Sequence, residues 1–235
     1  MTRISLVGTA HTDPYLVRNV SRALIAINPN FVTVERNPNK DYQAAGIQFF
    51  AKIIDGLVKR GRHLTNTELK VLDKICLDAM YQQEWTAVEK YCQKSKIPYE
   101  AIDLLSDECN AYNASIRHMI EQILPQDSLT SSPTQTQLRM FREQKVLSIY
   151  AQAREMFNDR RLSQQIVNDA RQNQVIGERD RVMAQKIEKI IQISHPARLV
   201  HVGGAFHMLN DLLHETLYER LTAHNPARSL VCDYT

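Results

Sequence analysis

Two short apolar runs, one near each end of the chain, break at a glycine that is followed three residues later by a histidine. Gly8 is followed by His11, and Gly204 is followed by His207. A short apolar run that ends in a turn is typical of a buried strand in a parallel sheet, and parallel strands end at the same edge. The repeated pattern therefore predicts that the two histidines form two halves of one site. For either histidine alone, a hydrogen bond within a strand-to-helix turn is the simpler interpretation, and the repetition favours function.

The first forty residues have the pattern of one strand–helix–strand unit. Residues 4–7 predict a strand, and Asp13 followed by Pro14 predicts a helix with Asp as N-cap and Pro at its first position. Residues 31–35 are mostly β-branched or apolar and predict a second strand that ends in Glu35. A unit of this size is normally right-handed and parallel. Glu35 is then expected at the same edge as the first histidine, where open α/β sheets bind ligands.

The middle of the chain is mainly helical in its patterning. The pattern predicts helices over about 47–58, 65–91, 106–124 and 136–194, a short strand at 99–103 and a polar surface loop at 125–137. Thr65 and Glu68 have the spacing of a capping box. We expect Asp103 at the end of the strand at 99–103, as Glu35 is expected at the end of the strand at 31–35.

The end of the chain returns to strand patterning. Residues 199–202 predict a fourth strand, the leucines between 209 and 221 predict a helix after His207, and residues 230–232 predict a last strand. The fold class expected is α/β, with a single domain over 1–235. Residues 1–40 and 196–235 would form a small, mostly parallel central sheet with a further strand near 99–103. Residues 41–195 would form a large, mostly helical insertion.

Composition narrows the class of partner. The 29 lysines and arginines against 26 aspartates and glutamates give a net charge of only +3, which supplies no large basic field for nucleic acid. No signal peptide follows Met1, and no apolar run is long enough to cross a bilayer. The four cysteines form no C-x-x-C pair, which favours a reduced protein. We therefore expect a cytoplasmic protein that binds neither nucleic acid nor membrane, while apolar helix faces leave a homodimer open.

Two acidic residues at strand ends are further candidates for the site. Glu35 and the adjacent Arg36 follow a nearly continuous apolar strand, where a buried carboxylate needs a cation or a metal. A surface salt bridge is the alternative for Glu35. Asp103 has the same placement after a shorter predicted strand, and for it the structural explanation is the better one.

The segment before the last predicted strand carries a charged cluster. Glu178 and Asp180 fall in the first turn of a predicted helix, where the helix dipole alone accounts for acidic residues. The functional interpretation has this cluster closing over the site, with Arg179 or Arg181 stabilising an oxyanion. His201 lies inside the fourth strand and is expected to be a core histidine with satisfied hydrogen bonds, although its position keeps it a tentative site residue.

Four motifs in this order resemble those of the TraB/PrgY family. They are residues 7–11 (VGTAH), 32–36 (VTVER), 178–184 (ERDRVMA) and 202–207 (VGGAFH). That family is related to the Tiki metalloproteases and, more distantly, to the erythromycin esterases and ChaN-like proteins. The resemblance covers both ends of the chain and the helix before the last motif. Family members tend to carry an Asp-Arg pair after the third strand, whereas here Leu104 follows Asp103.

The resemblance implies an α/β fold with a helical insertion and a site built from two histidines and a glutamate. By analogy with Tiki proteins, His11, His207 and Glu35 would hold a divalent metal, with manganese or cobalt favoured and zinc also compatible. Arg36, Glu178 and Arg179 would support catalysis, with Asp103, Asp180 and His201 as tentative members. In the esterase relatives a corresponding histidine is a general base that requires no metal.

The function expected is a metal-dependent hydrolase acting on a peptide or another amide. Glu178 would act as general acid or base, and Arg36 or Arg179 would balance charge in the transition state. One alternative is a non-catalytic protein of the TraB/PrgY type that binds a peptide or a small molecule. The other is a metal-independent, esterase-like hydrolase that uses histidine as general base.

Overall fold

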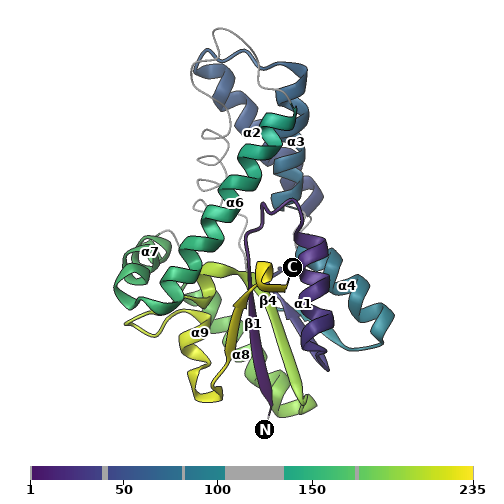
Figure 1. The fold of residues 1–235 in the computed structure, drawn as a ribbon, viewed down its shortest axis with the longest axis vertical. Helices are drawn as coiled ribbons and strands as arrows, with labels where there is room; N and C mark the ends of the chain where they lie inside the picture. The colour runs from purple at the N-terminus through teal and green to yellow at the C-terminus, as the bar shows by residue number, and fades with distance from the viewer. Residues whose placement is uncertain (1, 39–41, 81–82, 104–134, 173–174, 235) are drawn as a thin grey trace.

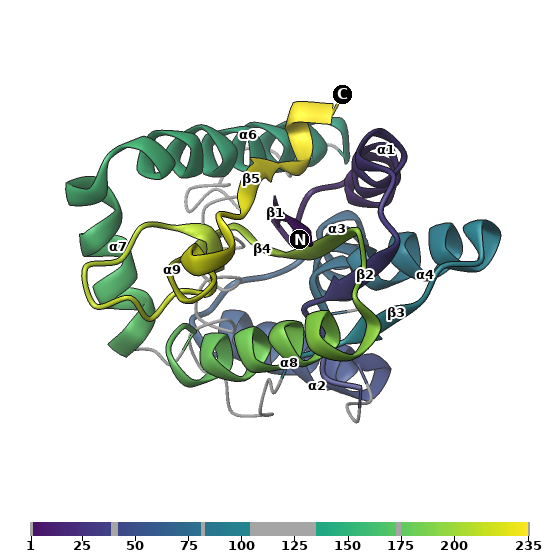
Figure 2. The same ribbon diagram turned by 90° about the horizontal axis from the view of Figure 1, so that it is seen from below.

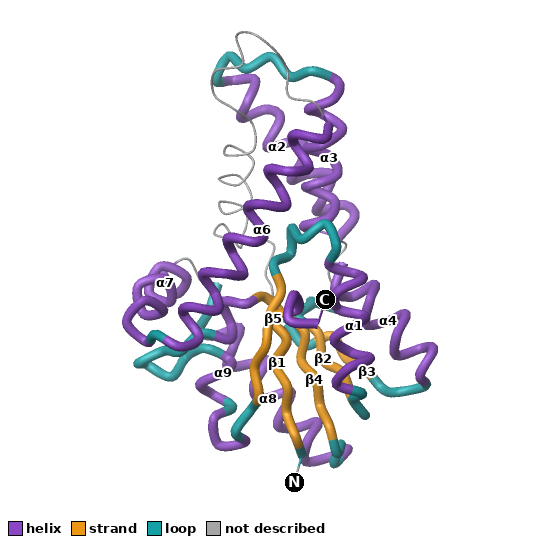
Figure 3. Tube along the Cα trace, in the orientation of Figure 1, coloured by secondary structure: helices purple, strands orange, loops and turns teal. Residues whose placement is uncertain are grey.

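The protein is built on a five-stranded, all-parallel sheet, which confirms the α/β fold class (Figures 1 and 3). The computed structural model describes residues 2–38, 42–80, 83–103, 135–172 and 175–234. The strands are β1 (Arg3–Thr9), β2 (Phe31–Val34), β3 (Tyr99–Ala101), β4 (Arg198–Gly204) and β5 (Ala227–Leu230), in the order β3-β2-β4-β1-β5. The expected helix at 106–124 and most of the expected loop at 125–137 lie outside the described residues.

The two ends of the chain meet at the centre of the sheet. β1 pairs with β4 along its whole length, so that Thr9 lies opposite Gly204. β2 pairs with the other side of β4, and β3 lies beyond β2. The carboxyl ends of β1, β2, β3 and β4 therefore lie side by side, as the strand patterning predicted.

Helices cover both faces of the sheet and extend past its carboxyl edge. The helices are α1 (Leu16–Ile27), α2 (Tyr42–Lys59), α3 (Asn66–Met80), α4 (Gln83–Ser95), α6 (Gln135–Asn158), α7 (Arg160–Gln172), α8 (Glu178–Ser194) and α9 (Leu217–Arg220). α8 lies on one face and α1 on the other, with α4 packed along α1 (Figure 2). α2, α3 and the first part of α6 form a helical projection beyond the carboxyl edge (Figure 1).

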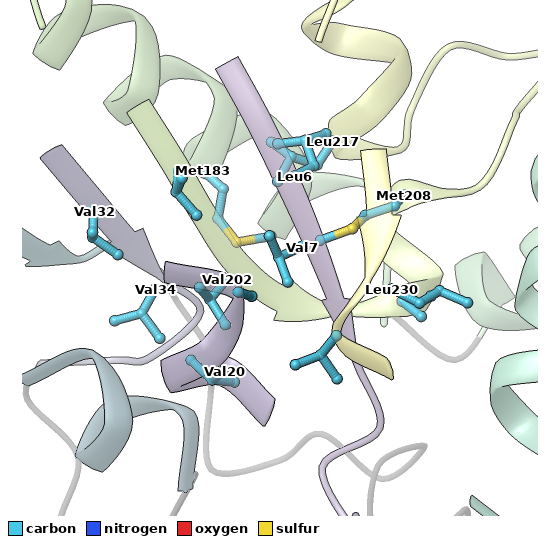
Figure 4. Close-up of a cluster of buried hydrophobic side chains, with 14 of the residues drawn as sticks. Leu6, Val7, Val20, Val32, Val34, Met183, Val202, Met208, Leu217 and Leu230 are labelled. Carbon is cyan, nitrogen blue, oxygen red and sulfur yellow. The ribbon is translucent and has the colours of Figure 1, made fainter. Parts of the chain in front are cut away.

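The core is formed by side chains that alternate between the two faces of the strands (Figure 4). Leu6 and Val7 on β1 are both fully buried, and they point to opposite faces because successive strand side chains alternate. Met183 of α8 and Val20 of α1 are also fully buried in this core. Each such side chain contributes about 1.5–3 kcal/mol by leaving water.

Helix boundaries depart from the sequence predictions at three places. α1 begins at Leu16, not after Asp13, because the Asp13 carboxylate accepts the Tyr15 N–H at 2.8 Å and stabilises a turn. The capping box at Thr65 and Glu68 is present, with Thr65 N 2.8 Å from Glu68 Oε2, but it opens α3 only and α4 is a separate helix. Residues 135–137 belong to α6 rather than to a loop.

The predicted leucine helix after His207 is wrong. The chain forms a short 3₁₀ turn, η1 (Ala205–Met208), and then a loop in which Asp211 accepts the N–H groups of Leu213 and Glu215 at 3.1 and 2.8 Å. Only Leu217–Arg220 is α-helical, and the Leu213 side chain is 62% exposed. Local side-chain hydrogen bonds of this kind compete with helix formation.

The last strand, β5, shares only Leu230 with the strand predicted at residues 230–232. Residues Val231–Tyr234 form a 3₁₀ turn, η3, and Thr222–His224 form another, η2. Among the described helices, none combines the length and the apolar character needed to cross a bilayer.

Candidate functional site

The two G-x-x-H histidines lie on either side of Glu35 at the carboxyl edge of the sheet. His11 follows β1 in a turn, His207 lies in η1 after β4, and Glu35 is the first residue after β2. Glu35 Oε1 is 3.2 Å from His207 Nε2 and 4.0 Å from His11 Nε2. The structure thus brings together the three residues that the sequence singled out first.

Glu35 is held by donors from three elements. Its Oε1 accepts from Arg179 Nη2 at 2.6 Å, and its Oε2 accepts from Gly204 N at 2.5 Å. Burial alone would raise the pKa of this carboxyl, but His207, Arg179 and His11 outweigh burial and hold the pKa well below its usual value. Glu35 is therefore a buried carboxylate that keeps its negative charge.

Arg179 also joins Asp103 to the site. Its Nε and Nη2 lie 3.1 and 2.7 Å from the two oxygens of Asp103, the second residue after β3. A guanidinium pairs well with a carboxylate in this two-point geometry. Arg179, at the start of α8, thus cross-links the ends of β2 and β3.

His207 lies between two carboxylates. Its Nδ1 is 2.9 Å from Asp180 Oδ1, and its Nε2 faces Glu35. Burial would lower the pKa of His207, but Asp180 and Glu35 together raise it to about 10. Both ring nitrogens therefore carry protons at neutral pH, and His207 is an imidazolium. Asp180 is itself held by Leu217 N at 2.6 Å.

His11 is paired with Glu84, a residue that the sequence analysis did not select. His11 Nδ1 lies 2.6 Å from Glu84 Oε1, which also accepts from Thr9 Oγ1 at 2.8 Å. Burial would lower the pKa of His11, but the Glu84 carboxylate more than offsets this and the pKa is raised. Glu84 shares the buried stripe of α4 with Ala87 and Val88, so a carboxylate within an apolar helix stripe was the available signal.

His201 is buried directly behind the site. Its Nδ1 is 3.1 Å from Thr33 Oγ1, whereas its Nε2 has no hydrogen-bond partner among the described residues. Burial lowers the pKa of His201 to about 4, so it is neutral. The expectation of a fully satisfied core histidine is therefore only half met. His201 and Glu35 both lie close to the backbone at Gly203. A Cβ at this position would lie 2.7 Å from His201 Nε2 and 2.9 Å from Glu35 Oε2, so only glycine fits there without a shift.

Two predicted site residues lie elsewhere. Glu178 is 68% exposed and pairs with Arg181 on the outer side of the first turn of α8, so it does not join the carboxylates of the site. The Arg36 guanidinium lies over the Trp85 ring, 4.9 Å from its centroid, where a cation–π contact stabilises it. Glu178 lies in the predicted helix and Arg36 directly follows Glu35 after β2, but the direction of each side chain is set by packing.

The residues as arranged do not fit a divalent metal. The Glu35 oxygen that lies between the two imidazoles already faces the Arg179 guanidinium and the His207 imidazolium, and a metal would be repelled by both charges. Within the described residues, no group of three or more His, Cys, Asp or Glu side chains has the geometry of a metal site. Metal binding at His207 would also require that ring to lose its proton.

Comparison of the chain with protein-family models, with characterised proteins and with solved structures finds no match. Function is therefore inferred from the geometry of the site.

Two side chains of this site are partly exposed to solvent. The exposed fraction is 17% for His11 and 11% for Arg179, against 4% for Glu35 and 2% for His207. An imidazole that is oriented by a carboxylate and accessible from outside can, in its neutral form, accept a proton from water. The guanidinium beside it can stabilise negative charge.

Proposed function

We propose that the protein is a hydrolase that cleaves an ester or an amide, including a peptide bond, with His11 as its general base. The observation that carries this proposal is the contact of 2.6 Å between His11 Nδ1 and Glu84 Oε1 at the edge of the sheet. A carboxylate in this position orients the imidazole and leaves Nε2 as the basic nitrogen. Of the ionisable side chains in this site, His11 is the most exposed to solvent.

The reaction would consume one water molecule. His11 Nε2 accepts a proton from water as the water oxygen bonds to the acyl carbon. The same proton is then transferred to the leaving oxygen or nitrogen as the scissile bond breaks, and this yields a carboxylic acid and an alcohol or amine. His11 ends in the state in which it began, so no covalent intermediate with the protein is needed.

The two cations of the site, Arg179 and His207, would provide positive charge at fixed positions near the base. Arg179 is held by Glu35 and Asp103, and His207 is held by Asp180 and Glu35. Charges whose positions are fixed before the reaction stabilise a developing oxyanion without a cost in reorganisation. Arg179, as the more exposed of the two cations, is the one we assign to the oxyanion.

The test is turnover of p-nitrophenyl acetate and of a library of quenched fluorescent peptides. His11→Asn should lower kcat/KM by about 10²–10⁴-fold, the usual contribution of a general base. His195→Asn is the matched control, because His195 is an exposed, left-handed cap at the end of α8 and asparagine tolerates that conformation. Equal activity of the His11 variant and the wild type would refute the assignment.

The metal-dependent form of this hydrolase stays a prediction, as does membership of the TraB/PrgY family. One feature favours it: His11 is oriented through Nδ1 by a carboxylate, as metal-binding histidines commonly are. Elemental analysis after loading with manganese, cobalt or zinc tests it, with His11→Asn plus His207→Gln as the comparison. About one equivalent bound only by the wild type would replace the metal-free proposal. Probe binding with no turnover would instead favour the non-catalytic alternative.

A further inference from the structure

His11 occupies a tight β-turn. Asp13 N donates to Ala10 O at 2.8 Å, so His11 and Thr12 are the two central residues of a four-residue turn that follows β1. The direction of the His11 ring therefore depends on the geometry of this turn as well as on the contact with Glu84.

One hydroxyl group joins the two ends of the turn. Tyr150 of α6 accepts from Ala10 N at 3.2 Å and donates to Asp13 Oδ2 at 2.9 Å. Asp13 and Tyr150 are 2% and 3% exposed, so this bridge is shielded from water. Burial, aided by the Asp13 charge, raises the pKa of the Tyr150 phenol, which keeps it a neutral donor.

A second side chain of α6 holds the middle of the turn. Arg142 Nε donates to Thr12 O at 2.8 Å, and the Arg142 side chain is buried. Arg142 and Tyr150 lie eight residues apart, about two helical turns, and thus on the same face of α6. The helix contacts the turn at both ends and at its centre.

The free-energy cost of burying these charged groups indicates that the contacts do more than stabilise the fold. Asp13 and Arg142 are charged and buried. Burial of a charge costs solvation free energy unless its partners compensate. An apolar helix face of the same shape could pack there without such groups. What the polar contacts add is a single fixed geometry for residues 10–13.

We propose that Tyr150 and Arg142 are positioning residues that aim the His11 imidazole, so that α6 controls the general base from 130 or more residues away in the chain. This inference rests on the proposed function. It adds that the helix which forms part of the projection beyond the sheet also sets the geometry of the catalytic turn (Figure 1).

The first test does not require a substrate. In protein labelled with ¹⁵N-histidine, the Nδ1 proton shared by His11 and Glu84 gives a downfield resonance that is assigned by its loss in His11→Asn. Tyr150→Phe removes only the bridging hydroxyl and should broaden or shift this resonance. Tyr15→Phe is the matched control, since the Tyr15 hydroxyl contacts α6 at Glu143 but does not bridge the turn.

Arg142→Lys provides a second variant in case the tyrosine variant does not fold, because it keeps the charge and removes the fixed Nε donor. With an active probe, both variants should lower kcat by about 10- to 100-fold with little change in KM, as expected for a misplaced catalytic group. An unchanged resonance in either folded variant would overturn the proposal. An altered resonance with no turnover in the wild type would refute the hydrolase and leave the positioning role intact.

Discussion

Glu84 contacts His11 through a hydrogen bond of 2.6 Å, although the two residues are 73 positions apart in the chain. Glu84 lies in the first turn of α4, and Thr9 at the end of β1 fixes the same carboxylate oxygen. The helix thereby reaches the edge of the sheet and supplies the partner that orients the histidine.

Replacement of Glu84 by glutamine should lower both the pKa of His11 and the rate of hydrolysis. The amide keeps the shape of the side chain but loses the negative charge that raises the pKa of His11. In serine proteases, the loss of the orienting carboxylate lowers kcat by about 10⁴-fold, which sets the scale for the largest effect here. An NMR titration of His11 and the esterase assay measure the two effects. A pKa of His11 unchanged from that of the wild type would contradict the role assigned to Glu84.

Replacement of Asp180 by asparagine should destabilise the fold by about 3–5 kcal/mol, because it removes one charge from a buried ion pair with His207. Asp180 is fully buried and also accepts the Leu217 N–H. Urea unfolding measures the change in the free energy of unfolding. Glu178→Gln is the matched control from the same helical turn, and because Glu178 is exposed we expect it to change stability little or not at all. Equal stability of both variants would show that the buried pair is not needed for the fold.

Stability should fall as the pH rises from about 6.5 to about 10. His207 has a pKa near 10 in the folded protein and an ordinary value of 6.5. Its protonation therefore stabilises the fold fully below the lower value and is lost as the pH passes the higher one. The test is the free energy of unfolding as a function of pH for the wild type and for His207→Gln. The difference between the two should shrink over this range, and a constant difference would contradict the assignment of an imidazolium.

Gly203→Ala should destabilise the protein by about 1–3 kcal/mol or more, as expected when an overpacked core must shift. The new Cβ would lie 2.7 Å from His201 Nε2 and 2.9 Å from Glu35 Oε2, and both neighbours are buried. Gly56→Ala is the opposite control, since Gly56 lies within α2 and a Cβ there meets nothing within 4 Å. That change should stabilise by about 0.5–1 kcal/mol. Thermal unfolding of both variants compares them directly.

Several parts of the fold could be predicted from the sequence pattern alone. Residues 31–35 and 199–202 are apolar runs with β-branched residues, and their burial in a parallel sheet follows from their composition. The G-x-x-H repeat placed His11 and His207 at one edge, because parallel strands share an edge and β1 and β4 pair in register. Glu35 followed from its position after an apolar strand.

Other parts of the fold could not be predicted from the sequence, because they depend on competition between local and distant contacts. The leucines after residue 208 have helical spacing, yet Asp211 binds the N–H groups of the loop and pairs with Arg171 of α7. Glu178 and Arg179 are neighbours in the sequence, but only Arg179 points to the buried carboxylates. A helix turns successive side chains by about 100°, so Glu178 and Arg179 point in different directions.

The amino-acid sequence by itself determined the class of fold, four of the five strands and the meeting of two histidines and a glutamate, because hydrophobic periodicity is a local property and parallel strands share an edge. The choice of partners for those residues depended on tertiary structure. Glu84 reaches His11 from α4, Tyr150 bridges the turn from α6, and Asp180 holds His207 from α8. Each contact joins segments that are distant in the chain, and its direction is set by how helices pack on the sheet, which no local pattern encodes.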